Sequence, residues 1–275
     1  MKKFMTCSGI VLGGLIVLIL LAGLALYPIG VKKLTRSYPG IPVETLSIPT
    51  DLAAIDRGRH ISIIWACTKC HGEALSGKLT ANDPFSGTIP ASNLTSGNNG
   101  IASSYTDADW IRAIRHGVKP NGRAETLMNN YASMSDQDLG DLLAYLKQLP
   151  PVNSDQPEMS FGVMVPITTA LGLWTPAAET IDHAASRPAE PVPGVTIEYG
   201  RYLSVLCTEC HRAKNIGIAV KDWSQEDYIH AFQTGVLPDG KPLSPAMPLK
   251  TFGEMSDTEL TAQWLYFHSL QPTSP

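Results

Sequence analysis

Two five-residue stretches, Cys67-Thr68-Lys69-Cys70-His71 and Cys207-Thr208-Glu209-Cys210-His211, share one pattern, Cys-x-x-Cys-His. On the order of 0.002 such matches are expected by chance in a chain of this composition, so two are not an accident. The spacing is the attachment signature of c-type haem, because two thiols separated by two residues can reach both vinyl groups on one edge of a porphyrin. The histidine that follows lies beneath the iron as its proximal ligand. We therefore predict two covalently bound haems, with His71 and His211 on their irons.

Two other uses of this spacing fit the chain less well. A structural zinc site needs four nitrogen or sulfur ligands, whereas each motif supplies three and no neighbouring cluster adds a fourth. A thioredoxin-like cysteine pair needs a βαβ context, which this helical, proline-rich sequence does not offer. The fifth cysteine, Cys7, precedes an apolar run and is interpreted as an incidental thiol.

The two motifs lie in two copies of one unit. Residues 57–61 match residues 199–203 ahead of each motif, and residues 109–118 match residues 227–236 at an offset of 118. The cysteines are offset by 140, so the first unit holds 22 extra residues after its motif. That insertion, residues 74–95, and the following residues 96–104 are rich in Ser, Thr, Asn and Gly. They are predicted to form a surface loop.

Each unit is predicted to be mostly helical. Ser135 and Ser256 are N-cap candidates, each followed by apolar residues at helical spacing, and Pro150 stops the first of these helices. The predicted fold is all-α, with two tandem haem domains after an N-terminal transmembrane helix. The expected boundaries are an anchor or signal segment over residues 1–36, a first domain over 51–150, a Pro-rich linker over 151–193 and a second domain over 194–275.

The linker contains an uncharged stretch of 14 residues, 161–174. It is too short to span a bilayer. The favoured interpretation is a segment packed between the two units, and the alternative is a contact with a membrane surface or a partner.

The N-terminus has no charged residue between Lys3 and Lys32. This run is longer than the 7–15 apolar residues usual in a signal peptide, which favours an uncleaved anchor, although Gly23-Leu24-Ala25 could serve as a cleavage site. Cations flank the run on both sides, so charge does not set its orientation. Haem attachment takes place outside the cytoplasm, which predicts a bacterial inner-membrane protein with the bulk of the chain in the periplasm.

The charge balance limits the classes of partner. The whole chain carries −4, and beyond residue 36 there are 16 basic against 25 acidic residues, or −9. Nucleic acid is excluded as a partner, because phosphate contacts need clustered Lys and Arg. A basic docking face on a redox protein is favoured.

The distal iron ligands are sought among the methionines, since Met or His completes the iron in electron carriers. Met247 lies in a proline-stiffened loop, between Pro245 and Pro248, and is assigned to the second haem. Met128 is assigned to the first, although Asn129 stands where the second unit has a proline. Met134 at a helix start, or an open iron, remains the alternative for the first haem.

The other histidines are given structural roles. His116 precedes Gly117 at a predicted helix end, where a cation suits the helix dipole. His60 is placed on the outer face of its helix, and His183, His230 and His268 show no partner pattern. Trp65, just before Cys67, is expected to lie near the haem.

On these motifs the sequence resembles the membrane-anchored dihaem members of the cytochrome c family. The resemblance rests on Arg57-Gly58-Arg59, both haem motifs, Asn93-Leu94-Thr95, the Thr106–His116 helix sequence and Met247-Pro248. It implies a helical domain whose first and last helices cross beside the porphyrin, closely at Gly58 and Gly200. It implies His71 and His211 as proximal ligands and Met128 and Met247 as distal ones; the missing proline after Met128 departs from the family pattern.

The resulting prediction is a one-electron carrier, not an enzyme, which serves a periplasmic dehydrogenase and the respiratory chain. Two irons with His and Met ligands leave no coordination site for a substrate. The alternative is a dihaem, peroxidase-like oxidoreductase with an open first haem. A haem-based sensor is the third interpretation, and it would need a signalling domain.

Overall fold

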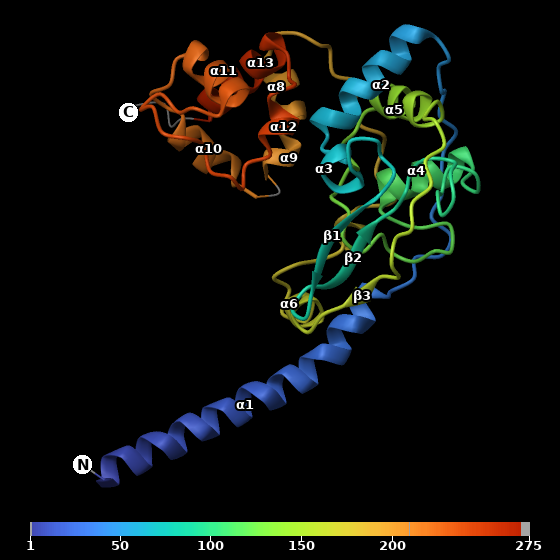
Figure 1. Ribbon diagram of the computed structural model, residues 1–275. Helices are drawn as coiled ribbons and strands as arrows, with labels where there is room; N and C mark the ends of the chain where they lie inside the picture. The colour runs from blue at the N-terminus through green and yellow to red at the C-terminus, as the bar shows by residue number, and fades with distance from the viewer. Residues whose placement is uncertain (1, 209, 271–275) are drawn as a thin grey trace.

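The computed structural model describes residues 2–208 and 210–270, and for residues 2–9 only the backbone. The side chain of Cys7, residue Glu209 of the second motif and the end of the second predicted domain, residues 271–275, lie outside the described part. A long helix, α1 (Lys2–Leu34), leads into two helical units that lie side by side (Figure 1). Its segment Ile10–Leu34 has a mean hydropathy of 2.8 and is long enough to cross a membrane, a property that signal sequences share.

The first unit combines helices with a β-hairpin. Its elements are α2 (Leu52–Ile64), α3 (Cys67–His71), β1 (Lys78–Asp83), β2 (Gly87–Ala91), α4 (Asp107–His116) and α5 (Asp136–Leu146). The connection to the second unit contains β3 (Ser160–Phe161), α6 (Met164–Ala170) and α7 (Ala177–Thr180). The second unit consists of α8 (Ile197–Leu203), α9 (Val205–Thr208), α10 (Ala213–Ala219), α11 (Gln225–Thr234), α12 (Leu249–Phe252) and α13 (Asp257–Ser269).

The predicted helix starts are confirmed. Ser135 accepts a hydrogen bond from the backbone N–H of Asp138 at the start of α5, and Ser256 forms a complete capping box with Glu259 at the start of α13. These bonds satisfy amide groups that a helix start leaves without intrahelical partners. The helix α5 ends at Leu146, ahead of Pro150.

The repeat seen in the sequence recurs as local structure. α4 ends at Gly117 and α11 at Gly235, both in the left-handed conformation. Each glycine begins a loop closed by an isolated antiparallel bridge, Val118 to Ala124 in the first unit and Val236 to Pro242 in the second. Equivalent residues thus adopt equivalent turns on the way to Met128 and Met247.

The helix crossing that the resemblance implies is present in both units. α2 packs against α5, and α8 packs against α13. At Gly58 the two backbones approach so closely that a Cβ would lie 1.9 Å from Asp141 O, and at Gly200 it would lie 1.9 Å from Ala262 O. Only glycine fits these positions, because atoms in a packed interior cannot approach so closely.

Gly58→Ala should therefore destabilise the first unit. The new methyl group would force α2 and α5 apart, at a cost of roughly 1–3 kcal/mol or more. Urea denaturation followed by circular dichroism measures the change. Gly13→Ala is the matched control, because Gly13 is also helical but has no atom within 4 Å of the position of a Cβ. Equal midpoints for the two variants would contradict the close crossing.

The prediction of a surface loop over residues 74–95 is wrong. β1 and β2 form an antiparallel hairpin within it, and β2 also pairs with β3 to complete a small sheet. With 46% helix and 8% strand, the structure is helix-rich as predicted, but the sheet must be added to the all-α description. The polar composition indicated a loop, whereas residues 78–83 and 87–91 pair with each other across the short turn at residues 84–86.

The favoured interpretation of residues 161–174 is also wrong. Met164–Ala170 forms α6, which packs against α1 and not between the two units. The alternative, a contact with a membrane surface or a partner, stays a prediction. In Figure 1 α6 lies beside the end of α1 nearest the body.

The two units meet through side chains that the sequence did not connect. His60 on α2 lies 2.9 Å from Glu259 on α13, instead of on a free outer face. Tyr202 on α8 donates to Asp138 on α5 at 2.5 Å, and its ring meets that of Trp65 at 5.4 Å between centroids. Buried residues of both units form one continuous hydrophobic cluster.

The His60–Glu259 contact changes both pKa values. The hydrogen bond to Glu259 raises the pKa of His60 above its ordinary value of 6.5. Burial alone would raise the pKa of Glu259, but hydrogen bonds from His60 and Ser256 hold it below 4.5. The contact therefore contributes its full stabilisation between the two ordinary pKa values, 4.5 and 6.5. This stabilisation is lost as the pH rises through the raised pKa of His60, and it is also lost as the pH falls through the lowered pKa of Glu259.

His60→Gln should consequently lower the melting temperature more at about pH 5.5 than at about pH 8.5, by on the order of 1–3 °C. Thermal unfolding of the two proteins at both pH values measures this. His230→Gln, at an exposed position on α11, is the control and should show a smaller pH-dependent difference. A larger loss at alkaline than at acid pH would contradict the charged contact.

Candidate haem site

The first Cys-x-x-Cys-His motif is held between two residues in an unusual backbone conformation. Ala66, which joins α2 to α3, has φ 61°, and the fully buried Leu75 has φ 53°. Residues other than glycine rarely adopt positive φ, and such strain persists only where the surroundings enforce it. The left-handed conformation of Ala66 changes the direction of the chain between α2 and α3. As a result, Cys67, Cys70 and His71 line one cavity.

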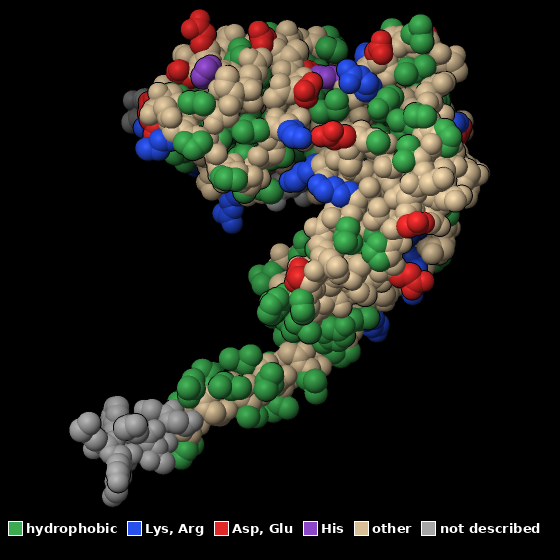
Figure 2. Space-filling view, in the orientation of Figure 1, with side chains coloured by type: hydrophobic (Ala, Val, Ile, Leu, Met, Phe, Trp, Pro, Cys, Tyr) green, Lys and Arg blue, Asp and Glu red, His purple; other side chains and the backbone are tan. Residues whose placement is uncertain are grey.

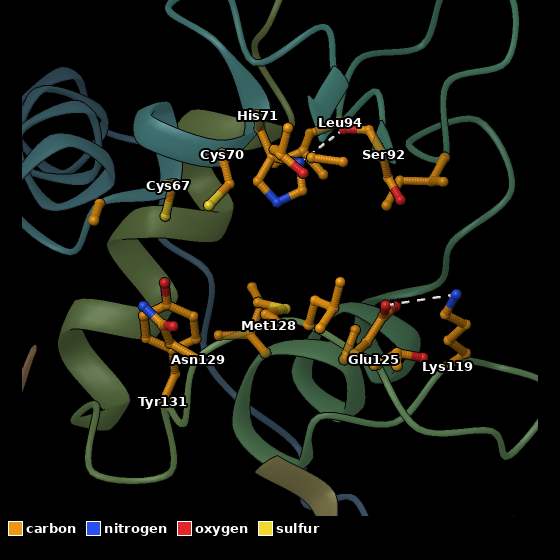
Figure 3. A pocket seen from close by; sticks show the side chains of 18 of the residues that line it. Cys67, Cys70, His71, Ser92, Leu94, Lys119, Glu125, Met128, Asn129 and Tyr131 are labelled. Atoms are coloured by element: carbon orange, nitrogen blue, oxygen red, sulfur yellow. Dashed lines mark hydrogen bonds and ion pairs between the residues drawn. The ribbon is translucent and has the colours of Figure 1, made fainter. Parts of the chain in front are cut away.

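This cavity lies between α3 and the loop that leads to α5 (Figure 3). Its empty volume is about 1110 Å³, a value that includes solvent space at the open mouth. The walls are largely apolar side chains from several elements, among them Ile89, Leu94, Trp110, Ile114, Leu142 and Leu146. Three of the wall positions, Ile89, Pro90 and Ala91, belong to the hairpin that replaced the expected loop.

His71 is oriented by a backbone group. Its Nδ1 lies 2.7 Å from the carbonyl oxygen of Ser92, to which it donates. This contact assigns the proton to Nδ1, leaves Nε2 as the free nitrogen and fixes the plane of the ring, as outer partners of metal-ligating histidines do. Burial lowers the pKa of His71, so the imidazole is neutral and able to bind a metal.

The two thiols line the same cavity from α3. Cys67 is half-buried and Cys70 exposed, and both side chains point toward the space beside His71 (Figure 3). Burial raises the pKa of Cys67 to about 12. The thiol is therefore protonated near neutral pH in the free chain.

Met128 lies on the wall opposite His71 (Figure 3). It is partly buried against the core, next to Asn129, which takes the place of the proline in the second unit. Met134 also lines the cavity but is 1% exposed and packs within the hydrophobic cluster. The structure thus brings together all four predicted residues of the first site, Cys67, Cys70, His71 and Met128. Their arrangement fits a haem held by thioethers on one edge and ligated from both faces.

Comparison with known proteins finds a family for the part of the chain that contains this cavity. Residues 55–150 match the family described as cytochrome c. The chain contains a cytochrome c domain. Such a domain carries a covalently bound c-type haem with its iron.

Several relatives carry similar names. The chain is 25% identical to the fructose dehydrogenase cytochrome subunit of Gluconobacter japonicus, over 71% of this chain and 44% of that protein. It is 29% identical to the gluconate 2-dehydrogenase cytochrome c subunit of Pantoea cypripedii, over 66% and 43%. A diheme cytochrome c-type protein of Cereibacter sphaeroides is 30% identical, over 62% and 60%. The chain spans less than half the length of the first two relatives.

The second motif has different surroundings. Burial raises the pKa of Cys207 to about 12, as in the cytochrome c domain, and Cys207 and Met247 both pack against the hydrophobic core. Cys210 and His211 are exposed. Among the described contacts no side-chain bond comparable with that from His71 to Ser92 holds His211, because the second unit lacks the inserted hairpin that supplies this carbonyl.

The roles given to the remaining histidines need one correction. His116 ends α4 as predicted, but the expectation of a cation there is wrong, because burial and the neighbouring His183 lower the pKa of His116 to about 4. Its Nδ1 lies 3.1 Å from Nδ1 of His183, and His183 also bonds Ala178 O at 3.0 Å. His268 bonds Val220 O at 3.0 Å. These histidines therefore have partners inside the fold that no spacing in the sequence indicated.

The sequence also missed an ion pair in the haem cavity. Glu125 and Lys119 both line it, with 3.7 Å between Oε2 and Nζ (Figure 3). Burial raises the pKa of Glu125, and Lys119 opposes this shift. Neither residue belongs to the haem motif, and only the loop closed by the Val118–Ala124 bridge brings them to the cavity.

Glu125→Gln should raise the reduction potential of this haem. The oxidised iron carries one more positive charge than the reduced iron, so an ionised carboxylate nearby favours the oxidised form. At alkaline pH we expect an increase on the order of tens of millivolts. The wild-type potential should fall as the pH rises through the pKa of Glu125, and the variant should lose this slope. Spectroelectrochemical titration over a pH series measures both effects.

Glu198→Gln removes an exposed carboxylate on the first turn of α8 and is the control. It should leave the potential of the first haem within a few millivolts of wild type, because exposed charges are screened by water and salt. Equal potentials for wild type and Glu125→Gln at alkaline pH would contradict a role for Glu125.

Proposed function

We propose that the chain is a dihaem electron carrier at the periplasmic face of a bacterial inner membrane, and not itself an enzyme. The observation that carries the proposal is the placement of His71 and Met128 on opposite walls of one cavity, beside Cys67 and Cys70. An iron ligated on both faces has no free position for a substrate, so its work is electron transfer.

The residues of the cavity have separate tasks. A c-type haem supplies the one-electron couple of its iron. Cys67 and Cys70 would hold the porphyrin edge covalently, and His71, oriented by Ser92, would bind the iron on one face. Met128 would bind the other face, and the apolar walls would limit the access of solvent to the iron, which influences its reduction potential.

The second haem is proposed on Cys207, Cys210, His211 and Met247. Its support is the repeated helix crossing at Gly200, the repeated turn after α11 and the likeness to a protein named as a diheme cytochrome. The contact between Trp65 and Tyr202 joins the segments that lead into the two motifs. This arrangement supports the passage of electrons from one unit to the other.

The proposed partners are redox proteins, a periplasmic dehydrogenase as donor and a component of the respiratory chain as acceptor. Two relatives are named as cytochrome subunits of dehydrogenases, which supports this class of donor. The acidic balance beyond residue 36 favours a partner with a basic docking face. The apolar α1 supports attachment to the membrane, with the haem-bearing units on the side where haem is attached.

Haem counting and ligand substitution test the proposal together. Pyridine-adduct absorbance should give two haems per chain, and one in the variant with Cys207→Ala and Cys210→Ala. In the oxidised protein two His–Met haems give a sulfur-to-iron band in the near infrared, and Met128→Ala should reduce its intensity by about half. Met247→Ala should have a similar effect.

Met159→Ala is the matched control, because Met159 lines the same cavity outside the motif and the loop. It should leave the near-infrared band at full intensity. A single haem in the wild-type chain would contradict the dihaem proposal, and an unchanged band in Met128→Ala would contradict the ligand assignment.

The peroxidase-like alternative requires an open first iron. The position of Met128 opposite His71 argues against it. Carbon monoxide distinguishes the two functions: the reduced wild-type protein should bind little, and Met128→Ala should bind it readily. Rapid uptake by the wild-type first haem would favour the enzyme.

A further inference from the structure

The C-terminal part of α1 is covered by α6 with almost no space between them. A Cβ on Gly30 would lie 1.8 Å from Pro166 O, and a Cβ on Gly23 would lie 3.6 Å from Ile167 Cδ1. Seven residues separate the two glycines, which corresponds to about 10 Å along the helix axis. The short helix α6 therefore lies along α1 and is part of the same packed body.

The tip of the β1–β2 hairpin lies against the start of α6. Met164 N–H donates to Phe85 O at 3.0 Å, and Val163 N–H donates to Pro84 O at 3.3 Å. Large apolar side chains here are strongly exposed: Phe85 66%, Val163 50%, Met164 44%, Leu171 56% and Leu173 74%. We call these five residues the apolar foot. Figure 2 shows hydrophobic side chains continuing from α1 onto the base of the body.

The length of α1 places this foot at the edge of a bilayer. Residues 4–31 form an uncharged run of 28 residues, about 42 Å at 1.5 Å per residue. A hydrocarbon core is about 30 Å thick and needs only about 20 residues. The excess lies in the region of Gly23 to Gly30 if the helix starts its crossing near Lys3, and that is the part which α6 covers.

The distribution of charged residues also places this surface at the edge of the bilayer. No charged residue occurs between Glu158 and Glu179, so the segment that contains α6 can enter an apolar environment. Lys32 and Arg36 are exposed just after the run, and Lys33 Nζ donates to Thr169 O at 3.5 Å. Cations at the end of an apolar surface match the anionic headgroups of a bilayer.

From these observations we infer that the apolar foot is immersed in the headgroup–acyl boundary of the membrane that α1 crosses. The partner of this surface is lipid, and the foot acts as a second attachment beside α1. The inference rests on the membrane anchoring in the proposed function.

The foot would also orient the haem cavity. Phe85 of the foot lies at the tip of the β1–β2 hairpin. Ile89, Pro90 and Ala91, four to six residues further along the same hairpin, line the haem cavity. A single helix leaves a domain free to rotate about its axis. A second contact with lipid removes that freedom and holds the cavity at one height above the bilayer.

Site-specific photo-crosslinking tests the inference on the full haem-loaded chain in lipid nanodiscs of phosphatidylethanolamine and phosphatidylglycerol. Benzoylphenylalanine replaces one of three exposed leucines: Leu173 in the foot, Leu18 in α1 or Leu52 at the start of α2. Mass spectrometry after illumination identifies the adducts. We expect on the order of tenfold more lipid adduct at position 173 than at position 52. Position 18 should label at least as strongly as position 173.

The three positions separate the possible failures. Lipid adduct at position 18 with only the background of position 52 at position 173 would overturn the foot and leave the anchor intact. A protein adduct at position 173, with a second copy of the chain, would also overturn it. Absence of lipid adduct at position 18 would overturn the membrane anchor and the foot together. Haem absorbance identical to that of wild type establishes that each variant is folded.

Discussion

The close contact between the backbones of α2 and α5 at Gly58 is the constraint on which the haem cavity depends. After α2 ends at Ile64, the strained residue Ala66 turns the chain into the motif helix α3, while α5 supplies Leu142 and Leu146 to the wall of the cavity. If the two helices moved apart, the motif would move with α2 and the cavity would widen. The same contact recurs at Gly200, so both units are organised by a crossing that needs only one small residue.

The inserted hairpin makes the two units unequal. It leads directly into Ser92, whose carbonyl group orients His71, and it supplies several positions of the cavity wall. Its tip reaches the base of the protein beside α6. The second unit has no such segment, and His211 is exposed. A haem in each unit would therefore have a different degree of exposure to water. Since burial and polar contacts adjust the potential of a haem, this asymmetry gives the two irons a physical basis for different potentials.

The interface between the units combines apolar packing with titrating groups. One hydrophobic cluster runs through both units, and the His60–Glu259 and Tyr202–Asp138 contacts lie on it. Burial raises the pKa of Asp138 to about 6, against the opposing hydrogen bond from Tyr202. A shared core makes the units fold as neighbours in a defined orientation, which the proposed transfer of electrons between two haems would require.

The residues alone indicated the two Cys-x-x-Cys-His motifs, the duplicated helices with their Ser caps and the apolar N-terminal helix, because these are local patterns whose spacing carries the physical cause. The crossing at Gly58 and Gly200 was implied by the resemblance to the cytochrome c family, and the structure contains it. The three-dimensional structure was needed to show that α6 covers α1, that His60 pairs with Glu259 and that Ser92 orients His71. Each of these contacts joins groups far apart in the chain, and a lone histidine does not specify which distant partner it will meet. The hairpin at residues 78–91 pairs neighbouring strands, but its polar composition indicated a loop.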